Sequence, residues 1–162
     1  MAIERTGKAA ELYERGKKLM EEWKTGSDVE KTIAVFTEVI KLLPDDDESY
    51  IKRGECYDTV DQFEKALADF DKAISLNPED GFHYNSRAKI YLQLGENEKA
   101  KADIEKAVEV QPNGAGYFYM AFGKKINDCT GDKREAAKYL KKSIEHGDYD
   151  DMAKAKLAEW GM

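Results

Sequence analysis

Large apolar residues return along this chain at steps of three and four positions, the spacing that places them on one face of an α-helix. The apolar runs come in pairs, and a proline closes each pair. Pro44, Pro78 and Pro112 are the only prolines, and they lie 34 residues apart. Because proline cannot continue the hydrogen-bond ladder of a helix, each one stops the helix before it. A fixed period of 34 residues indicates a two-helix repeat that stacks on its neighbours.

Counting back from each proline gives three ungapped blocks, at 13–46, 47–80 and 81–114. The second and third blocks carry large apolar residues, small residues where two helices approach, and a turn residue at matching positions. These positions are Tyr50, Gly54, Tyr57, Asp61, Phe63, Ala66, Phe70 and Ala73 in the second block and Tyr84, Ala88, Tyr91, Gly95, Ala100, Ile104 and Ala107 in the third. The first block is more divergent.

The pattern resembles the tetratricopeptide repeat (TPR) family, whose repeats follow W-x2-L-G-x2-Y, then A-x3-F, then P. The resemblance covers residues 13–114. It implies an all-α fold, a right-handed superhelix of stacked helix pairs. It also implies a module that binds peptides or proteins, with no enzymatic activity and no cofactor.

The N-terminal part extends beyond the regular repeats. Residues 2–25 are predicted to form one long helix, because their apolar residues follow a single face. The turns at 2–12 precede the first repeat and either cap the array or mediate dimerisation. The whole chain, 1–162, is expected to be one domain.

The C-terminal part is irregular. Residues 115–147 are predicted to form a helix pair with an insertion near its turn, and this stretch also resembles a Sel1-like repeat. Residues 149–162 are predicted to form a short amphipathic helix. That helix either covers the open apolar end of the array or docks a partner through Trp160.

The resemblance also implies where a ligand binds. In the family, residues one, four, eight and eleven positions after each repeat start line the concave groove. These residues are Glu14, Lys17, Glu21, Lys24, Glu48, Ile51, Glu55, Asp58, Phe82, Asn85, Lys89 and Leu92, with Tyr119 in the irregular block. Apolar residues within a stripe that is otherwise solvent-facing favour a binding surface. A fitting protein or peptide pairs a basic stretch with an apolar anchor.

One family specialisation disagrees with this sequence. TPR domains that hold the acidic tails of heat-shock chaperones use lysines, asparagines and an arginine along the groove. Lys17 matches one member of that clamp, but Glu21 and Lys52 replace the asparagines. Phe82 and Ser86 replace the later lysine and arginine. The sequence therefore argues against binding of such a tail.

The net charge of −7 argues against nucleic acid as the main partner, because that binding needs a basic surface. Block 47–80 carries ten acidic and four basic residues. This excess is either a solvated face that keeps the protein soluble or a patch for a basic partner. An alternative function is therefore a dedicated chaperone, or an immunity-type inhibitor, for a basic client protein.

The sequence offers little for catalysis, metals or membranes. His83 and His146 are far apart in the sequence. Cys56 and Cys129 lie in different repeats and are not expected to form a disulfide, and unpaired cysteines are consistent with a reducing, cytoplasmic compartment. The acidic run 45–48 lacks the spacing of a calcium loop and is predicted to cap a helix. No run of about 18 apolar residues is present, and the start of the chain lacks the apolar run of a secretory signal.

Overall fold

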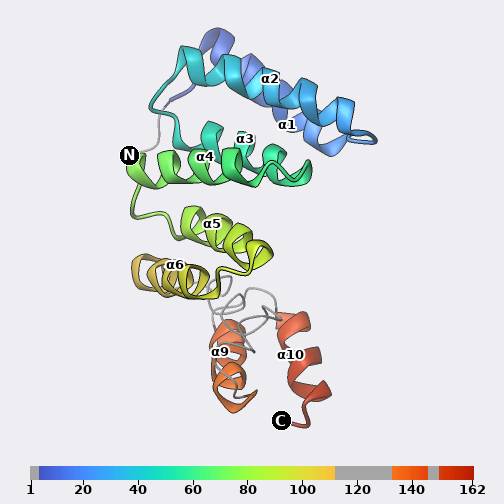
Figure 1. The fold of residues 1–162 in the computed structure, drawn as a ribbon, viewed down its shortest axis with the longest axis vertical. Coiled ribbons are helices and arrows are strands. Elements are labelled where there is room, and N and C mark those ends of the chain that lie inside the picture. Colours follow the sequence, from blue (N-terminus) through green and yellow to red (C-terminus); the bar gives the residue numbers. More distant parts are fainter. Residues whose placement is uncertain (1–3, 112–132, 146–149) are drawn as a thin grey trace. The chain divides into compact units, whose positions relative to one another are not determined.

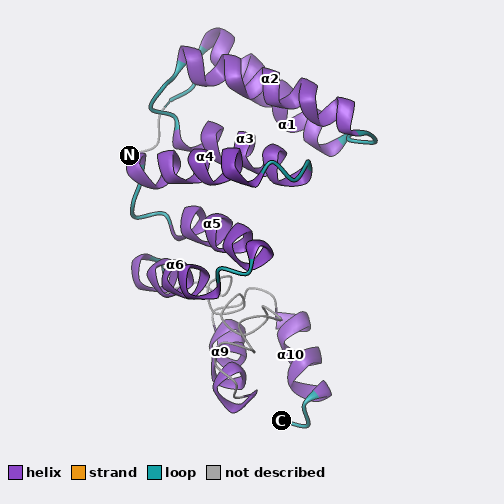
Figure 2. Ribbon diagram, in the orientation of Figure 1, coloured by secondary structure: helices purple, strands orange, loops and turns teal. Residues whose placement is uncertain are grey.

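The computed structural model describes residues 4–111, 133–145 and 150–162, and these residues form eight helices and no strand (Figure 1, Figure 2). The predicted all-α class is confirmed. The chain divides into two compact units, Met1–Pro78 and Glu79–Met162, and each is described by itself. The helix pair predicted over 115–147 is described only at residues 133–145, and Tyr119 lies outside the described residues.

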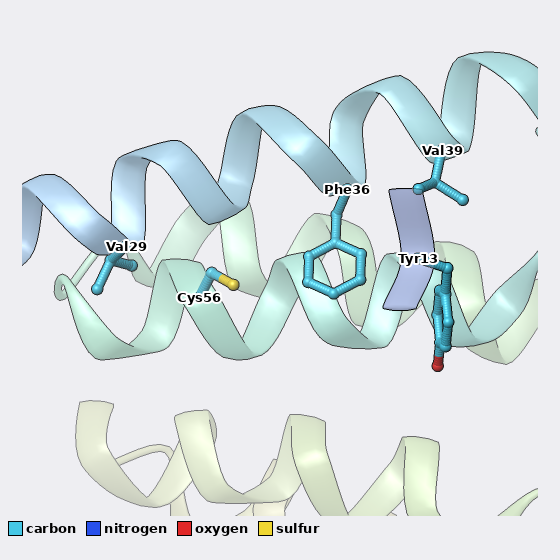
Figure 3. Close-up of a cluster of buried hydrophobic side chains, with 5 residues drawn as sticks. All are labelled: Tyr13, Val29, Phe36, Val39 and Cys56. Carbon is cyan, nitrogen blue, oxygen red and sulfur yellow. The ribbon is translucent and has the colours of Figure 1, made fainter. Parts of the chain in front are cut away.

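In the first unit, consecutive helices pack against each other. They are α1 (Gly7–Glu21), α2 (Gly26–Leu42), α3 (Asp47–Thr59) and α4 (Phe63–Leu76). Apolar side chains of the first three helices form a buried cluster of Tyr13, Val29, Phe36, Val39 and Cys56 (Figure 3). The rings of Tyr13 and Phe36 meet edge to face, with centroids 5.8 Å apart, an orientation that aromatic pairs favour.

Helix α1 is shorter than the helix predicted over 2–25. It begins at Gly7, after Thr6 in an extended conformation, and ends at Glu21. The end is set by the next helix, because Thr25 and Asp28 cap α2. The Thr25 backbone N–H and hydroxyl both donate to the Asp28 carboxylate, at 3.2 and 2.9 Å. Residues that form this cap cannot also continue α1.

The predicted helix ends and turns of the repeats are confirmed in the residues that the structure describes. Pro44 and Pro78 follow the ends of α2 and α4. Asp61, two residues after the end of α3, and Gly95, directly after the helix at 81–94, adopt left-handed backbone conformations, with φ of 56° and 79°. Such a residue reverses the chain at a helix end, and glycine does so without strain. Pro112 lies outside the described residues.

In the second unit, α5 (Gly81–Leu94) packs against α6 (Asn97–Val110) around Ala88, Ala100 and Ile104. The start of α5 lies close to the end of α6, since a Cβ atom on Gly81 would come within 2.8 Å of a backbone oxygen of α6.

Helices α9 (Lys133–Glu145) and α10 (Asp150–Glu159) also belong to the second unit and pack against each other. Their buried contact residues are Ala137, Leu140, Ala153 and Leu157, and Trp160 packs against them. A helix is present within the expected range 149–162 as α10, and it buries Ala153 and Leu157. Its role as a cap of the array stays a prediction.

None of the helices in the described ranges is long and apolar enough to cross a lipid bilayer.

Candidate interaction surfaces

Two close contacts fix the register of the repeats in the first unit. Gly16 of α1 faces the Phe36 ring, and a Cβ atom on Gly16 would lie 2.6 Å from it. Gly54 of α3 faces the Phe70 ring in the same way, at 2.5 Å. The chain advances 20 residues from glycine to phenylalanine in the first pair and 16 in the second. The first pair therefore holds four extra residues between these contact points.

The extra residues correct the ungapped register of block 13–46. When α1 is aligned with α3 on the two glycines, the ligand-facing positions implied by the family become Ala10, Tyr13, Lys17 and Met20 instead of Glu14, Lys17, Glu21 and Lys24. The sequence held a signal for this shift, because Arg15 and Gly16 repeat as Arg53 and Gly54. A side chain at either glycine would meet the phenylalanine ring, so in these two pairs the glycine marks the register better than the proline does.

The stripe on α3 that the family implies for ligand contact is acidic where it is accessible. Glu48 is exposed, and Glu55 and Asp58 are half-buried. Ile51 is a correction to the predicted set, because only 2% of its surface is exposed and it belongs to the core. Its counterpart on α1 in the new register, Tyr13, is also buried at 6%. An apolar side chain at this position is covered by its neighbours and is not presented to a ligand.

Two of the α3 carboxylates already interact with groups of the same unit. Glu48 accepts hydrogen bonds from the Tyr13 hydroxyl at 2.9 Å and from Arg5 at 2.7 Å. Burial alone raises the pKa of Glu48, but the Tyr13 hydrogen bond and the charge of Arg5 outweigh it and hold the pKa below its ordinary value. Glu55 pairs with Lys52 at 2.9 Å. The stripe is thus an acidic surface, and Glu48 at its first position is already hydrogen-bonded to Tyr13 and Arg5.

Two cavities lie beside the connection between α1 and α2. The smaller has a volume of about 230 Å³ and is lined by Trp23, Lys24, Thr25, Gly26, Val29, Thr59 and Val60. The larger, of about 620 Å³, is lined by Leu19, Glu21, Glu22, Lys24 and Asp28. Glu21 and Lys24, which were predicted to line the groove, therefore lie at this connection. Glu14 is exposed and forms an ion pair with Lys17 at 2.8 Å.

In the second unit, α5 presents two of its four predicted residues to solvent. Phe82 has 48% of its surface exposed, and Lys89 is exposed as well. Phe82 is held at the start of the helix because its backbone N–H donates to the Asp80 carboxylate at 2.9 Å. Asn85 is buried at 4%, and Leu92 packs on the core of the α5–α6 pair. Asn85 is a correction to the accessible set, whereas Leu92 is partly exposed.

A recurring ion pair was not found by the sequence analysis. Arg53 of α3 donates two hydrogen bonds to Asp69 of α4, at 2.8 and 2.7 Å. Arg87 of α5 does the same to Asp103 of α6, at 2.8 and 2.6 Å. Both carboxylates are buried, and the two pairs are 34 residues apart. The repeat period contained this signal, and the pairs join the first helix of a repeat to the second.

The described cysteine and histidine are core residues. Cys56 is buried, and burial raises the pKa of its thiol to about 12, so the thiol stays protonated at neutral pH. His83 is also buried, with its Nε2 3.7 Å from a carboxylate oxygen of Asp80. Within the described ranges no group of three or more His, Cys, Asp and Glu side chains is placed to hold a metal ion. Cys129 and His146 lie outside those ranges.

Comparison with known proteins places these helix pairs in a family context. Two family models of the tetratricopeptide repeat match, one at residues 48–80 and one at 84–113. The chain therefore contains TPR repeats, and the two matched segments correspond to the α3–α4 and α5–α6 pairs. No curated protein matches the chain.

Solved structures show the same all-α repeat fold. The thermophilic TPR protein TTC0263 of Thermus thermophilus matches with a TM-score of 0.76 and 19% identity, over 91% of this chain and 78% of that one. The first TPR domain of Spaghetti (RPAP3), solved with the HSP90 peptide SRMEEVD, matches with a TM-score of 0.67 and 24% identity, over 77% and 94%. YrrB, described as a TPR protein with an unusual peptide-binding site, matches with a TM-score of 0.63 and 26% identity, over 78% and 66%.

Proposed function

We propose that this chain is a non-enzymatic protein-interaction module that binds a peptide or protein partner through the first helices of its repeats. The observation that carries the proposal is the pair of TPR repeats at 48–80 and 84–113. In stacked repeats each unit contacts only its neighbours, which leaves an extended surface for a ligand. The peptide-binding site named for YrrB, at 26% identity, supports the same class of function.

For the first unit we propose a basic partner. Met1–Pro78 contains 18 acidic and 12 basic residues, whereas Glu79–Met162 contains 15 and 14. The accessible stripe of α3 presents Glu48, Glu55 and Asp58. Opposite charge on a partner accelerates the encounter and fixes its orientation, while an acidic competitor is repelled.

For the second unit we propose contact with an apolar group. Phe82 exposes about half of its surface at a position that the family implies for ligand contact, and Lys89 lies two helical turns further along α5. An aromatic side chain contributes large contact area at low entropic cost, so Phe82 is the residue of α5 on which binding energy should depend most.

A second candidate function is a dedicated chaperone or immunity-type inhibitor for a basic client. The uneven charge of the two units supports it, because an excess of acid concentrated in one unit suits a single basic protein surface. Genes next to the coding sequence discriminate between the two functions, since a secretion apparatus or a toxin gene favours a dedicated client. A Sel1-like character of 115–147 and a cytoplasmic location also stay proposals.

The proposal is tested by affinity capture from native cells, followed by calorimetry with the purified partner. The variant is Glu55→Lys/Asp58→Lys on α3. The matched control is Glu30→Lys/Glu64→Lys, which reverses two exposed charges on the second helices α2 and α4. We expect the α3 variant to weaken binding of a basic partner at least tenfold, because two attractive contacts become repulsive.

The control variant should bind within about twofold of the wild type, since rim charges that do not face the partner contribute little. If both variants weaken binding equally, the effect comes from the net charge of the protein, and α3 is not the binding surface. A partner that is lost only with Phe82→Ala would shift the site to α5. Failure to capture any partner in several growth conditions would count against the module.

A further inference from the structure

The segment before α1, residues 4–6, reaches the acidic end of α3 through a single side chain. Arg5 donates from Nε to Asp46 Oδ2 at 2.8 Å and from Nη2 to Asp46 Oδ1 at 2.6 Å. The same Nη2 donates to Glu48 at 2.7 Å. The guanidinium carbon also lies 3.8 Å from the centre of the Tyr13 ring. Four interactions from three side chains therefore converge on one guanidinium group.

The geometry is specific for a guanidinium group. Its planar fork matches both oxygens of the Asp46 carboxylate, and its flat face stacks on the Tyr13 ring. A lysine ammonium is a point charge that cannot make both contacts at once. The Tyr13 hydroxyl donates to Glu48 at 2.9 Å, which orients the second carboxylate toward the same group.

The receiving groups are built into the fold, whereas the arginine comes from its edge. Asp46 is 1% exposed and also accepts a hydrogen bond from Ser49, so its carboxylate is fixed at the start of α3. Tyr13 is part of the buried cluster formed by α1, α2 and α3. Arg5 instead precedes α1, beyond a turn at Gly7 with a left-handed φ of 53°. The receiving residues thus belong to the packed first unit, and their occupant lies in the segment 4–6 that precedes α1, called the arm below.

The site also coincides with the surface proposed for a partner. Glu48 is the first of the α3 positions that the family implies for ligand contact, and it is exposed. Tyr13 is buried and contributes the ring on which the guanidinium group stacks. We propose that Tyr13, Asp46 and Glu48 form an arginine-binding site, which Arg5 fills in the free protein and which an arginine of the basic partner fills in the complex. The partner step rests on the function proposed above, while the guanidinium site can be tested without a partner.

The first experiment asks whether the site accepts a guanidinium ion from solution. Arg5→Ala empties the site, and its thermal midpoint is followed as methylguanidinium or methylammonium chloride is added at equal ionic strength. We expect a saturable rise of about 3 °C at ten times the dissociation constant of methylguanidinium, and none with methylammonium. The wild type, whose site is filled, and Arg5→Ala/Asp46→Asn, whose site is broken, should show no such rise.

An equal response to both ions, or the same response in Arg5→Ala/Asp46→Asn, would overturn the site. If Arg5→Ala does not fold, the Arg5 Nε–H proton of the wild type is followed by NMR instead. That proton donates to Asp46 and should give a shifted, slowly exchanging signal that is absent from Arg5→Lys. A signal at the position and exchange rate of a solvated arginine would contradict the site.

The second experiment uses the partner identified by capture. When the arm is displaced by a partner arginine, Arg5→Ala should bind that partner several-fold more tightly than the wild type, because competition by the arm is removed. Replacing the partner arginine by lysine should remove that advantage. If methylguanidinium stabilises Arg5→Ala but the capture experiments find no partner, the site stands and the proposed function is refuted. A partner that binds both forms equally keeps the function and shows Arg5 to be a permanent structural contact, which overturns the exchange.

Discussion

The α1–α2 pair and the α3–α4 pair share one packing contact and differ in the interactions around it. In both pairs, a phenylalanine of the second helix packs against a glycine of the first. The α3–α4 pair adds the buried fork between Arg53 and Asp69. In the α1–α2 pair the position of Asp69 is taken by Val35, and Arg15 is exposed.

Their connections differ as well. After α1 the Trp23 indole donates to Thr32 of α2 at 2.9 Å, and the cavities lined by Trp23 and Glu21 lie beside this connection. After α3 the chain turns on the single left-handed residue Asp61. The difference teaches that the first two pairs share the glycine–phenylalanine contact, whereas they differ in the ion pair and in the connection between their helices.

The largest expected effect comes from breaking the ion pair that only the later repeats have. Arg53→Met leaves the Asp69 carboxylate buried without its cation, and we expect it to lower the free energy of unfolding by about 3 kcal/mol. Urea unfolding followed by circular dichroism measures this loss. The double variant Arg53→Met/Asp69→Val removes both charges and places at position 69 the residue type of Val35 in the first pair, so it should recover most of the stability. A double variant as unstable as Arg53→Met would show that the fork is needed for packing and not only for charge.

A smaller loss is expected from the contact that both pairs share. Gly54→Ala places a Cβ atom 2.5 Å from the Phe70 ring, so the ring or the helix must move, and we expect a cost of about 1–2 kcal/mol. The third pair suggests the matched rescue, because it combines Ala88 with the smaller Ile104 at the corresponding positions. Gly54→Ala/Phe70→Ile should therefore be more stable than Gly54→Ala. Additive losses in a double-mutant cycle would show that the two residues do not constrain each other.

The fold was predictable from the sequence because its strongest signals are local. Prolines stop helices wherever they occur, and the apolar spacing defines a helix face without knowledge of the partner. The residues between the helices were harder to predict. The end of α1 depends on the cap formed by Thr25 and Asp28, and the register depends on which glycine meets which ring.

The candidate surface was predictable only in part. Glu48, Glu55, Phe82 and Lys89 lie at least partly in solvent as expected, since their exposure follows from helix phase alone. Ile51 and Asn85 lie on the same stripe but are buried, because burial depends on neighbouring side chains that periodicity does not reveal. The contact of Arg5 with Asp46 spans 41 residues and joins an irregular segment to a turn. No repeat period connects such residues, so the sequence held no signal for it.

The smallest effect is expected at the repeat position that holds Glu48 in the second repeat and Phe82 in the third. The pKa of Glu48 lies below its ordinary value of about 4.3 in the folded state, because the Tyr13 hydrogen bond and the Arg5 charge outweigh its burial. The folded state therefore binds fewer protons than the unfolded state. The stabilisation by Glu48 is complete at pH values above the ordinary pKa, and it is lost as the pH falls through the lower pKa of the folded state. Glu48→Gln should be less stable than the wild type at pH 7. The loss should be only a few tenths of a kcal/mol, because the carboxylate is mostly exposed. The difference should disappear near pH 3 in urea titrations, while Glu30→Gln, which changes an exposed residue of α2, should follow the wild type throughout. A difference that stays constant from pH 7 to pH 3 would mean that Glu48 acts through shape and not through its charge.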